Sequence, residues 1–320
     1  MKIDAYEAAE FLKTHDDYLI LMHASPDGDT LGSGFALCGI LQRMGKRARA
    51  VCPDPIPHRF DYMYRAVKQQ DFEPQTIVCV DVADTKLLGD MKEVGDRAAL
   101  CIDHHISNTE YAERLYLHAE YAAAAECVYD VICALGEEID TEIANCIYTG
   151  VATDTGCFRF SNTTPQSHMI AAVMIKCGAE ITPINYAMFD MKSQGRIKLE
   201  QEVLKNIRYY AGGHIALITV TLDMLAKITD IDSDDVGALS AIPRQIEGVD
   251  IGICLKEKKA GVYKASLRSS ERINVSDICV GFGGGGHARA AGCSFTSSIE
   301  DAEKVLVDAC CKAIAEAGIE

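Results

Sequence analysis

The 320-residue sequence lacks the features of membrane, secreted and disulfide-stabilised proteins. No apolar run approaches the roughly 20 residues that a membrane-spanning helix needs. The first 18 residues, MKIDAYEAAEFLKTHDDY, carry acidic side chains where a secretory signal peptide would be apolar. None of the 14 cysteines belongs to a CxxC pair, and most stand inside apolar runs, which indicates buried, reduced thiols. These absences predict a cytoplasmic protein with no membrane partner.

Positive charge is also scarce. The chain has 31 Lys and Arg against 47 Asp and Glu, a formal net charge of −16. Binding of a long nucleic-acid duplex depends on many phosphate contacts from basic side chains, so such a duplex is not an expected partner. A small anionic substrate in a local positive site remains compatible. Between residues 242 and 290, eight basic residues stand against five acidic ones, a balance of +3 that ordinary surface variation explains on counts alone.

The first part of the chain alternates buried strands with amphipathic helices. Strands are predicted at 18–24, 47–52, 76–83 and 98–105. Helices are predicted at 30–45 and at about 122–135, 140–153 and 165–177. Near-continuous apolar strands in such alternation indicate an α/β fold with a doubly wound, mainly parallel sheet. We predict that this domain covers residues 1–190.

A long polar-apolar helix follows at 192–210 and ends at Gly212 and Gly213, so we interpret residues 191–212 as a helical linker. Beyond it, the segments HIALITVT, VDIGICLKE and VYKASLRS read as further strands, and a last helix is predicted from about 299 to 317. The sequence therefore predicts a second, smaller α/β domain over residues 213–320.

Acidic and histidine residues cluster where the predicted strands of the first domain end, and near the end of a later helix. They are His23, Asp27, Asp29, Asp81, Asp84, Asp103, His104, His105 and Asp154. Strand ends of a doubly wound sheet share one rim, where ligands bind. Each residue alone has an ordinary alternative; Asp29, for example, could cap the helix that begins near Thr30.

Taken together, these carboxylates would repel one another unless a cation neutralised them. Oxygen ligands with two adjacent histidines suit Mn²⁺ or Mg²⁺, with Fe²⁺ or Co²⁺ as alternatives, better than a thiolate zinc site. The number of acids suffices for two divalent metal ions, which in such sites activate a water toward phosphorus. The rim is therefore a predicted metal site.

The second domain has a glycine run, Gly283 to Gly286, whose backbone N–H groups could form an anion-binding nest. A flexible linker is the alternative, but the run stands between two segments that must pack. Arg268 and His287 offer charge-assisted donors for a phosphate, whereas Arg289 fits a solvated side chain equally well.

Four motifs in order, HASPDGDTLGSG, VDVAD, DHH and TDTG, resemble the metal motifs of the DHH phosphoesterase superfamily. The later segments SLRSS and GFGGGGHARAAGC resemble the DHH-associated C-terminal domain. The nearest branch is that of stand-alone oligoribonucleases (nanoRNases) and pAp phosphatases. One departure is the stretch Ala122–Ala125 before Glu126, where relatives tend to carry serine or threonine.

The resemblance implies specific roles. His23, Asp27 and Asp81 would hold one metal; a second would be held by Asp29, Asp81, His104 and Asp154, with Asp81 bridging. As catalytic groups, His105 would face the scissile phosphate and Asp103 would orient the histidines. The residues expected to grip the terminal phosphate or nucleotide are Arg268, Gly284, Gly285, Gly286 and His287. Asp84 receives no role beyond that of a turn residue.

The implied enzyme is a Mn²⁺-dependent phosphoesterase that hydrolyses short oligonucleotides, 3′,5′-bisphosphonucleotides such as pAp, or both, by a metal-activated water. A phosphodiesterase for linear (pApA, pGpG) or cyclic dinucleotides is the main alternative, followed by an inorganic pyrophosphatase or a non-catalytic nucleotide sensor. The expected partners are short RNA or DNA oligonucleotides or nucleotide bisphosphates, and a homodimer is compatible with the sequence.

Overall fold

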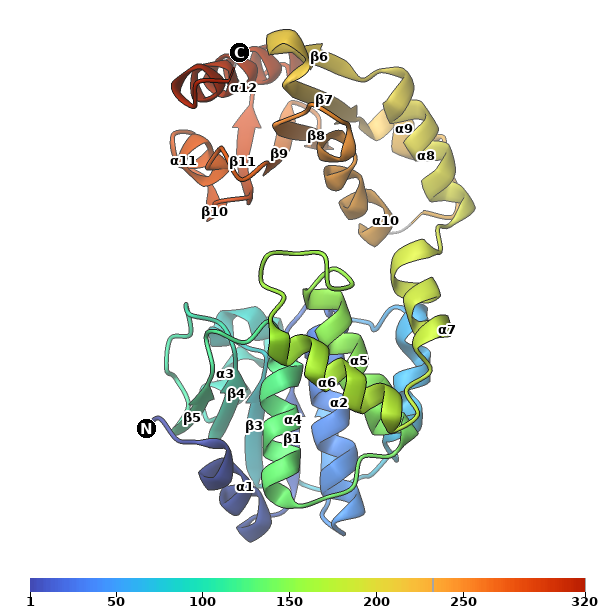
Figure 1. Cartoon of the computed structure of the whole chain (residues 1–320), viewed down its shortest axis with the longest axis vertical. Coiled ribbons are helices and arrows are strands. Elements are labelled where there is room, and N and C mark those ends of the chain that lie inside the picture. Colours follow the sequence, from blue (N-terminus) through green and yellow to red (C-terminus); the bar gives the residue numbers. More distant parts are fainter. Residues whose placement is uncertain (232, 320) are drawn as a thin grey trace. The chain divides into compact units, whose positions relative to one another are not determined.

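The computed structural model of the chain describes residues 1–231 and 233–319. It forms two compact units, Met1–Met191 and Lys192–Glu320, each with a hydrophobic core of its own (Figure 1). All 14 cysteines are free, and most are buried. Within the described residues, no helix combines the length and apolar character needed to cross a membrane.

The first unit contains a five-stranded sheet in the order β2-β1-β3-β4-β5, with every pair parallel. The strands are β1 (Tyr18–Leu21), β2 (Ala48–Val51), β3 (Thr76–Val80), β4 (Leu100–Asp103) and β5 (Arg114–Leu117). This is one of the two common doubly wound orders, and it has its topological switch point between β1 and β3. The predicted doubly wound α/β fold is confirmed.

Both faces of this sheet are buried because alternate side chains of each strand enter different cores. Ile20, Val78 and Ile102 belong to one core and Leu21, Cys79 and Cys101 to the other. The first core is completed by α1 (Ala5–Thr14), α2 (Gly28–Arg43), η1 (His58–Ala66), α4 (Ala124–Leu135), α5 (Thr141–Asp154), α6 (Pro165–Lys176) and α7 (Ile181–Asn185). Next to the second core lie η2 (Thr85–Met91) and α3 (Lys92–Gly95), and η3 (Tyr186–Asp190) ends the unit.

Several helices begin at side-chain caps that the sequence supplies. Asp4 and Glu7 form a capping box at α1, and Thr164 caps α6 ahead of Pro165. At α2 the cap is Asp27, whose Oδ1 accepts hydrogen bonds from the backbone N–H groups of Asp29 (3.0 Å) and Thr30 (3.1 Å). Asp29 is therefore not the cap, and its side chain is free for another role.

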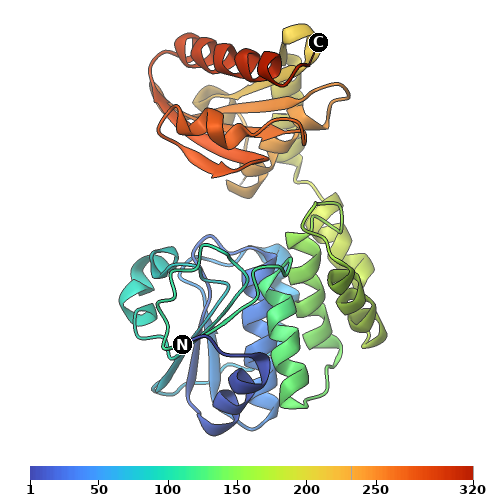
Figure 2. The ribbon, with the colours of Figure 1, turned by 60° about the vertical axis from the view of Figure 1, so that its left-hand side comes forward.

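The second unit contains a six-stranded mixed sheet in the order β10-β11-β9-β8-β7-β6, in which only β7 and β8 pair in parallel. Its strands are β6 (Arg208–Tyr210), β7 (Ile215–Val220), β8 (Ile251–Lys259), β9 (Val262–Ser269), β10 (Gly285–His287) and β11 (Ala290–Thr296). The helices α11 (Val275–Val280) and α12 (Ile299–Glu316) pack on one face, along which α12 runs in Figure 2. This confirms a second, smaller α/β domain.

The opposite face of this sheet is covered only in part. Leu199 and Val203 of α8 pack there against Ile218 of β7 and Cys254 of β8. The remaining short elements are α8 (Gln194–Lys205), η4 (Ala211–Gly213), α9 (Leu222–Ala226), α10 (Ser233–Ala238), η5 (Leu239–Ala241) and η6 (Pro243–Gln245). The segment 191–212, interpreted above as a linker, thus contains α8 and β6, which both pack within this unit.

Candidate active site

Three strand ends at the centre of the first sheet carry the candidate site. His23 follows β1 by two residues, Asp81 follows β3 directly, and Asp103 ends β4 ahead of His104 and His105. Because β1, β3 and β4 are neighbours in the sheet, their carboxyl ends meet at the switch point, where ligands of doubly wound folds bind.

Asp81 lies at the centre of this group. Its Oδ2 is 3.4 Å from His23 Nε2, and its Oδ1 is 3.7 Å from His104 Nε2. The residue is 2% exposed, and Oδ1 is buried without a hydrogen-bond partner in the protein. Its φ of 61° is a left-handed conformation that few residues other than glycine adopt, which is typical of functional sites. His105 Nδ1 also lies 3.5 Å from Oδ1, so this one carboxylate faces three histidines.

The other acids form one group with Asp81 and a second group with His104. In the first, His23, Asp27 and Asp81 place ligand atoms within 4.8 Å of one another. In the second, His104 Nε2 lies 3.8 Å from Asp29 Oδ2 and 3.5 Å from Asp154 Oδ2. The structure therefore brings all six predicted metal-binding residues together, and a third group of the same kind joins Asp81 and His104 to His105.

Asp29 is held by the backbone of α4. Its Oδ2 accepts a hydrogen bond from Ala124 N–H at 2.6 Å, and its Oδ1 accepts one from Ala125 N–H at 2.9 Å. The stretch Ala122–Ala125 is buried and contributes backbone donors at a helix N-terminus, which favours a carboxylate there. No side-chain hydroxyl is needed for this contact, so the alanines fit the site.

Close helix packing brings α2 and α5, and with them Asp29 and Asp154, together. A Cβ on Gly150 would lie 2.9 Å from Asp29 Oδ1 and 2.5 Å from the Cβ of Ala125. A Cβ on Gly28 would lie 2.4 Å from Thr153 Oγ1. Glycine at these two positions is what lets the acids approach the same histidine.

Backbone carbonyls orient two of the histidines. His104 Nδ1 is 3.2 Å from the carbonyl oxygen of Tyr121, and His23 Nδ1 is 2.8 Å from that of Ala24. With Nδ1 as the donor in each ring, Nε2 presents its lone pair to the carboxylate groups, the arrangement common among metal-binding histidines. The sequence analysis missed Tyr121, because a backbone contact leaves no signature in the side-chain pattern.

His105 has a different partner. Its Nδ1 lies 2.8 Å from Asp103 Oδ1, and Asn108 Nδ2 donates to Asp103 Oδ2 at 2.6 Å. Burial acts to raise the pKa of Asp103, but these hydrogen bonds outweigh it and lower that pKa below its ordinary value. The same bond to Asp103 raises the pKa of His105. Asp103 thus fixes the ring through Nδ1, and Asn108, which sequence reasoning missed, fixes Asp103.

Asp84 lies outside these groups. Its carboxylate accepts a hydrogen bond from Lys86 N–H at 2.9 Å and caps η2, as expected for a turn residue.

The electrostatics of the rim fit divalent cations. Burial, followed by the charges of Asp29 and Asp27, raises the pKa of Asp81 well above its ordinary value. Burial also raises the pKa of Asp29, and burial with Asp29 and Asp81 raises that of Asp154 to about 10. Carboxylates in such positions ionise at neutral pH only if a positive charge offsets their repulsion. Together with the Asp81 Oδ1 that lacks a hydrogen-bond partner, the donor set suits hard divalent ions.

The raised pKa of Asp154 predicts how the metal-free protein responds to pH. The pKa of Asp154 is 3.8 in the unfolded chain and about 10 in the fold, so the fold favours the protonated carboxyl. The contribution of Asp154 to the free energy of unfolding is therefore fully present below pH 3.8. That contribution is lost as the pH rises from 3.8 toward 10. Calorimetric melting with a chelator should therefore show stability falling across this window, and Mn²⁺ should oppose the fall. Asp154→Asn should flatten the chelated profile, and an unchanged profile in that variant would contradict the assignment.

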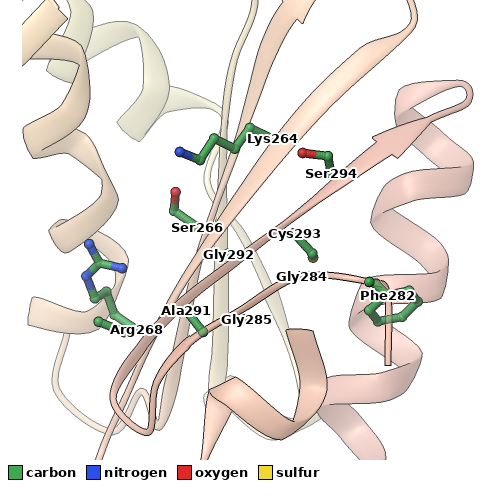
Figure 3. A pocket seen from close by; sticks show the side chains of 12 residues that line it. Lys264, Ser266, Arg268, Phe282, Gly284, Gly285, Ala291, Gly292, Cys293 and Ser294 are labelled. Carbon is green, nitrogen blue, oxygen red and sulfur yellow. The ribbon is translucent and has the colours of Figure 1, made fainter. Parts of the chain in front are cut away.

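The second unit carries a groove of about 480 Å³ on the uncovered part of its sheet (Figure 3). It is lined by Lys264, Ser266 and Arg268 of β9, by Phe282 and Gly283–Gly285, and by residues 290–294 of β11. Of the predicted substrate-binding residues, Arg268, Gly284 and Gly285 line it, whereas Gly286 and His287 do not. The glycine run is no flexible linker, because Gly285 to His287 form β10 and a Cβ on Gly284 would lie 2.1 Å from Gly292 O.

The first unit is thus doubly wound with an acidic and histidine rim, and a mixed-sheet unit follows it in the chain. The chain belongs to the DHH family. The model of the DHH family N-terminal domain matches residues 17–151, and that of the DHHA1 domain matches residues 217–316.

Relatives extend this match over almost the whole chain. A bifunctional oligoribonuclease and PAP phosphatase NrnA from Thermus thermophilus is 30% identical over 97% of this chain and 94% of its own length. The protein of the same name from Bacillus subtilis is 24% identical over 94% of this chain and 96% of its own. An exopolyphosphatase-related protein from Bacteroides fragilis has a similar structure, with a TM-score of 0.85, 27% identity and coverage of 95% and 94% of the two chains. The chain is accordingly a phosphoesterase.

Proposed function

We propose that the protein is a Mn²⁺-dependent phosphoesterase that hydrolyses very short oligonucleotides and 3′,5′-bisphosphonucleotides such as pAp. The observation that carries the proposal is the position of Asp81 between His23 and His104, with one oxygen toward each. The names of the Thermus and Bacillus relatives support the substrate class, since both match nearly full length.

In this proposal two cations occupy the two groups of the rim. His23, Asp27 and Asp81 would hold one, and Asp29, His104 and Asp154 would hold the other, with Asp81 close enough to His104 to serve both. Such a pair supplies an activated water and neutralises charge on the phosphoryl oxygens. Ala124 N–H, Ala125 N–H and the Tyr121 carbonyl keep Asp29 and His104 in position.

His105 acts on the substrate side. Because its Nδ1 is engaged by Asp103, the ring offers Nε2–H as a donor when it is protonated. The raised pKa of His105 favours that form at neutral pH. We assign His105 to hold a phosphoryl oxygen or to protonate the leaving oxygen, and Asp103 to position it.

The groove of the second unit binds the part of the substrate that does not react. Arg268 contacts no carboxylate among the described residues, and its Nη1 donates only to the Leu267 carbonyl oxygen at 3.0 Å. A guanidinium half-buried in a glycine-lined groove is suited to a phosphate. The backbone of Gly284 and Gly285 allows the ligand to approach closely.

A parallel assay tests the substrate class. The chain with Mn²⁺ should release phosphate from pAp and mononucleotides from dinucleotides, and should act at least about tenfold more slowly on pyrophosphate and on long single-stranded DNA, for which the acidic surface offers no basic track. Rates on pyrophosphate that exceed those on both nucleotides would indicate an inorganic pyrophosphatase. Absence of turnover with every substrate would overturn the proposal in favour of a nucleotide sensor.

A further inference from the structure

The groove contains more positive charge than Arg268 alone supplies. Alternate residues of β9, Lys264, Ser266 and Arg268, project from the same face of the strand into the groove (Figure 3). On β8, Lys256 is the direct register partner of Lys264, so its side chain stands beside that of Lys264 on this face. Three cations thus lie on one open part of the sheet.

None of these three cations has an ion-pair partner in the portion of the chain that the structure describes. Lys192, Lys205 and Lys312 of the same unit pair with glutamates at 2.8, 2.7 and 3.7 Å, whereas five further lysines, Lys198, Lys227, Lys258, Lys259 and Lys304, also lack an ion pair among the described residues. Lys256 and Lys264 differ from these other lysines in position, because they stand opposite each other on neighbouring strands at the groove that Lys264 lines.

Without a bound anion, the pair Lys256 and Lys264 lowers the stability of the folded protein. Like charges directly opposite on neighbouring strands destabilise a sheet. Partial burial, followed by the charges of Lys258 and Lys264, lowers the pKa of Lys256. A bound anion removes this repulsion; Lys264 lines the groove, and Lys256 stands next to Lys264 on the neighbouring strand.

The spacing defines the ligand. Lys264 and Arg268 are four residues apart on an extended strand, so their Cα atoms are separated by roughly 13 Å. Between them lie the Ser266 hydroxyl and, on β11, Gly292, which leaves space. A substrate with one non-reacting phosphate offers an anion to Arg268 alone, whereas two phosphates joined through a nucleoside offer one to each position.

We propose that Lys256 and Lys264 form a second phosphate-binding position, which favours 5′-phosphorylated oligonucleotides over substrates with one non-reacting phosphate. The inference rests on the proposed function only for the identity of the substrate. Arg268 holds the first non-reacting phosphate, and the lysine pair holds the next one along the chain. Ser266 and Ser294, which also line the groove, offer hydroxyls to the intervening sugar.

The test compares three substrates with the full chain: pApApA, ApApA, which lacks the 5′ phosphate, and pAp. ApApA and pAp each carry one non-reacting phosphate, and pApApA carries two. Lys264→Gln combined with Lys256→Gln should raise KM for pApApA about tenfold, the size expected of a charge-assisted contact, and should leave kcat unchanged. KM for ApApA and pAp should change less than about twofold. Lys264→Arg should retain the preference, and Lys304→Gln, on α12 of the other face, should behave as wild type.

A binding measurement separates this inference from the proposed function. Calorimetric titration with a chelator present should show pApApA binding about tenfold more tightly than ApApA, and the double variant should lose that difference. If the difference appears without turnover in Mn²⁺, the proposed activity fails and the phosphate position stands. If wild type binds both equally, or the double variant weakens all three substrates alike, the phosphate position is overturned.

Discussion

Asp81→Asn should abolish divalent-cation-dependent hydrolysis, by at least about three orders of magnitude, and yet raise the melting temperature of the metal-free protein. The loss follows from removal of the carboxylate that lies between His23 and His104 and that we propose both cations share, since such cations contribute several kcal/mol to stabilisation of the transition state. The gain follows because the variant removes a buried acid that its neighbours repel. Asparagine tolerates the left-handed backbone at this position, so the fold should persist.

A matched control lies on the same loop. Asp84→Asn makes the same carboxylate-to-amide change three residues later. Asp84 belongs to neither cation group, and its side chain caps η2. It should keep full activity and full stabilisation by Mn²⁺. Equal loss of activity in Asp84→Asn and Asp81→Asn, or retained Mn²⁺ stabilisation in Asp81→Asn, would contradict the bridging assignment.

His105→Ala should lower kcat by about two to three orders of magnitude while the cations stay bound, because the proposed contact is to the substrate. Asp103→Asn should have a smaller effect, about 10- to 100-fold, because it removes only the partner that positions the ring. It should also shift the pH dependence of kcat to lower pH, since the bond to Asp103 is what raises the pKa of His105.

His58→Ala is the control for this series, because the His58 side chain is 99% exposed on η1 and belongs to none of the cation groups. Its kinetics should match those of wild type. Metal analysis decides the role of His105: if His105→Ala loses a bound cation, His105 is a ligand and not a substrate contact.

His23, Asp81 and His104 could be anticipated from the sequence because each closely follows a strongly apolar strand, and parallel strands end at one edge; Asp154 instead ends the helix α5. The order of the strands in the sheet decides whether His23, Asp81 and His104 lie close together. That order depends on contacts between distant segments and cannot be predicted from local sequence patterns. The distinction between Asp27 as cap and Asp29 as buried acid also depended on α4, whose backbone donors lie about a hundred residues later in the chain.

The second unit was harder to anticipate. The strands β10 and β11 are rich in glycine and alanine, which have low strand propensity, and they form a hairpin only because their backbones pack closely. Lys256 and Lys264 are eight residues apart, and the surplus of basic residues in this region looked like surface variation. The register between β8 and β9 places the two lysines side by side.

The central claim is that two cations bridged by Asp81 make this chain a phosphoesterase for short nucleotides. It is tested most directly by titrating metal-free protein with Mn²⁺ while following phosphate release from pAp. Activity should rise with added Mn²⁺ and reach its plateau at two equivalents per chain. A plateau at one equivalent, or full activity in the presence of a chelator, would contradict the claim.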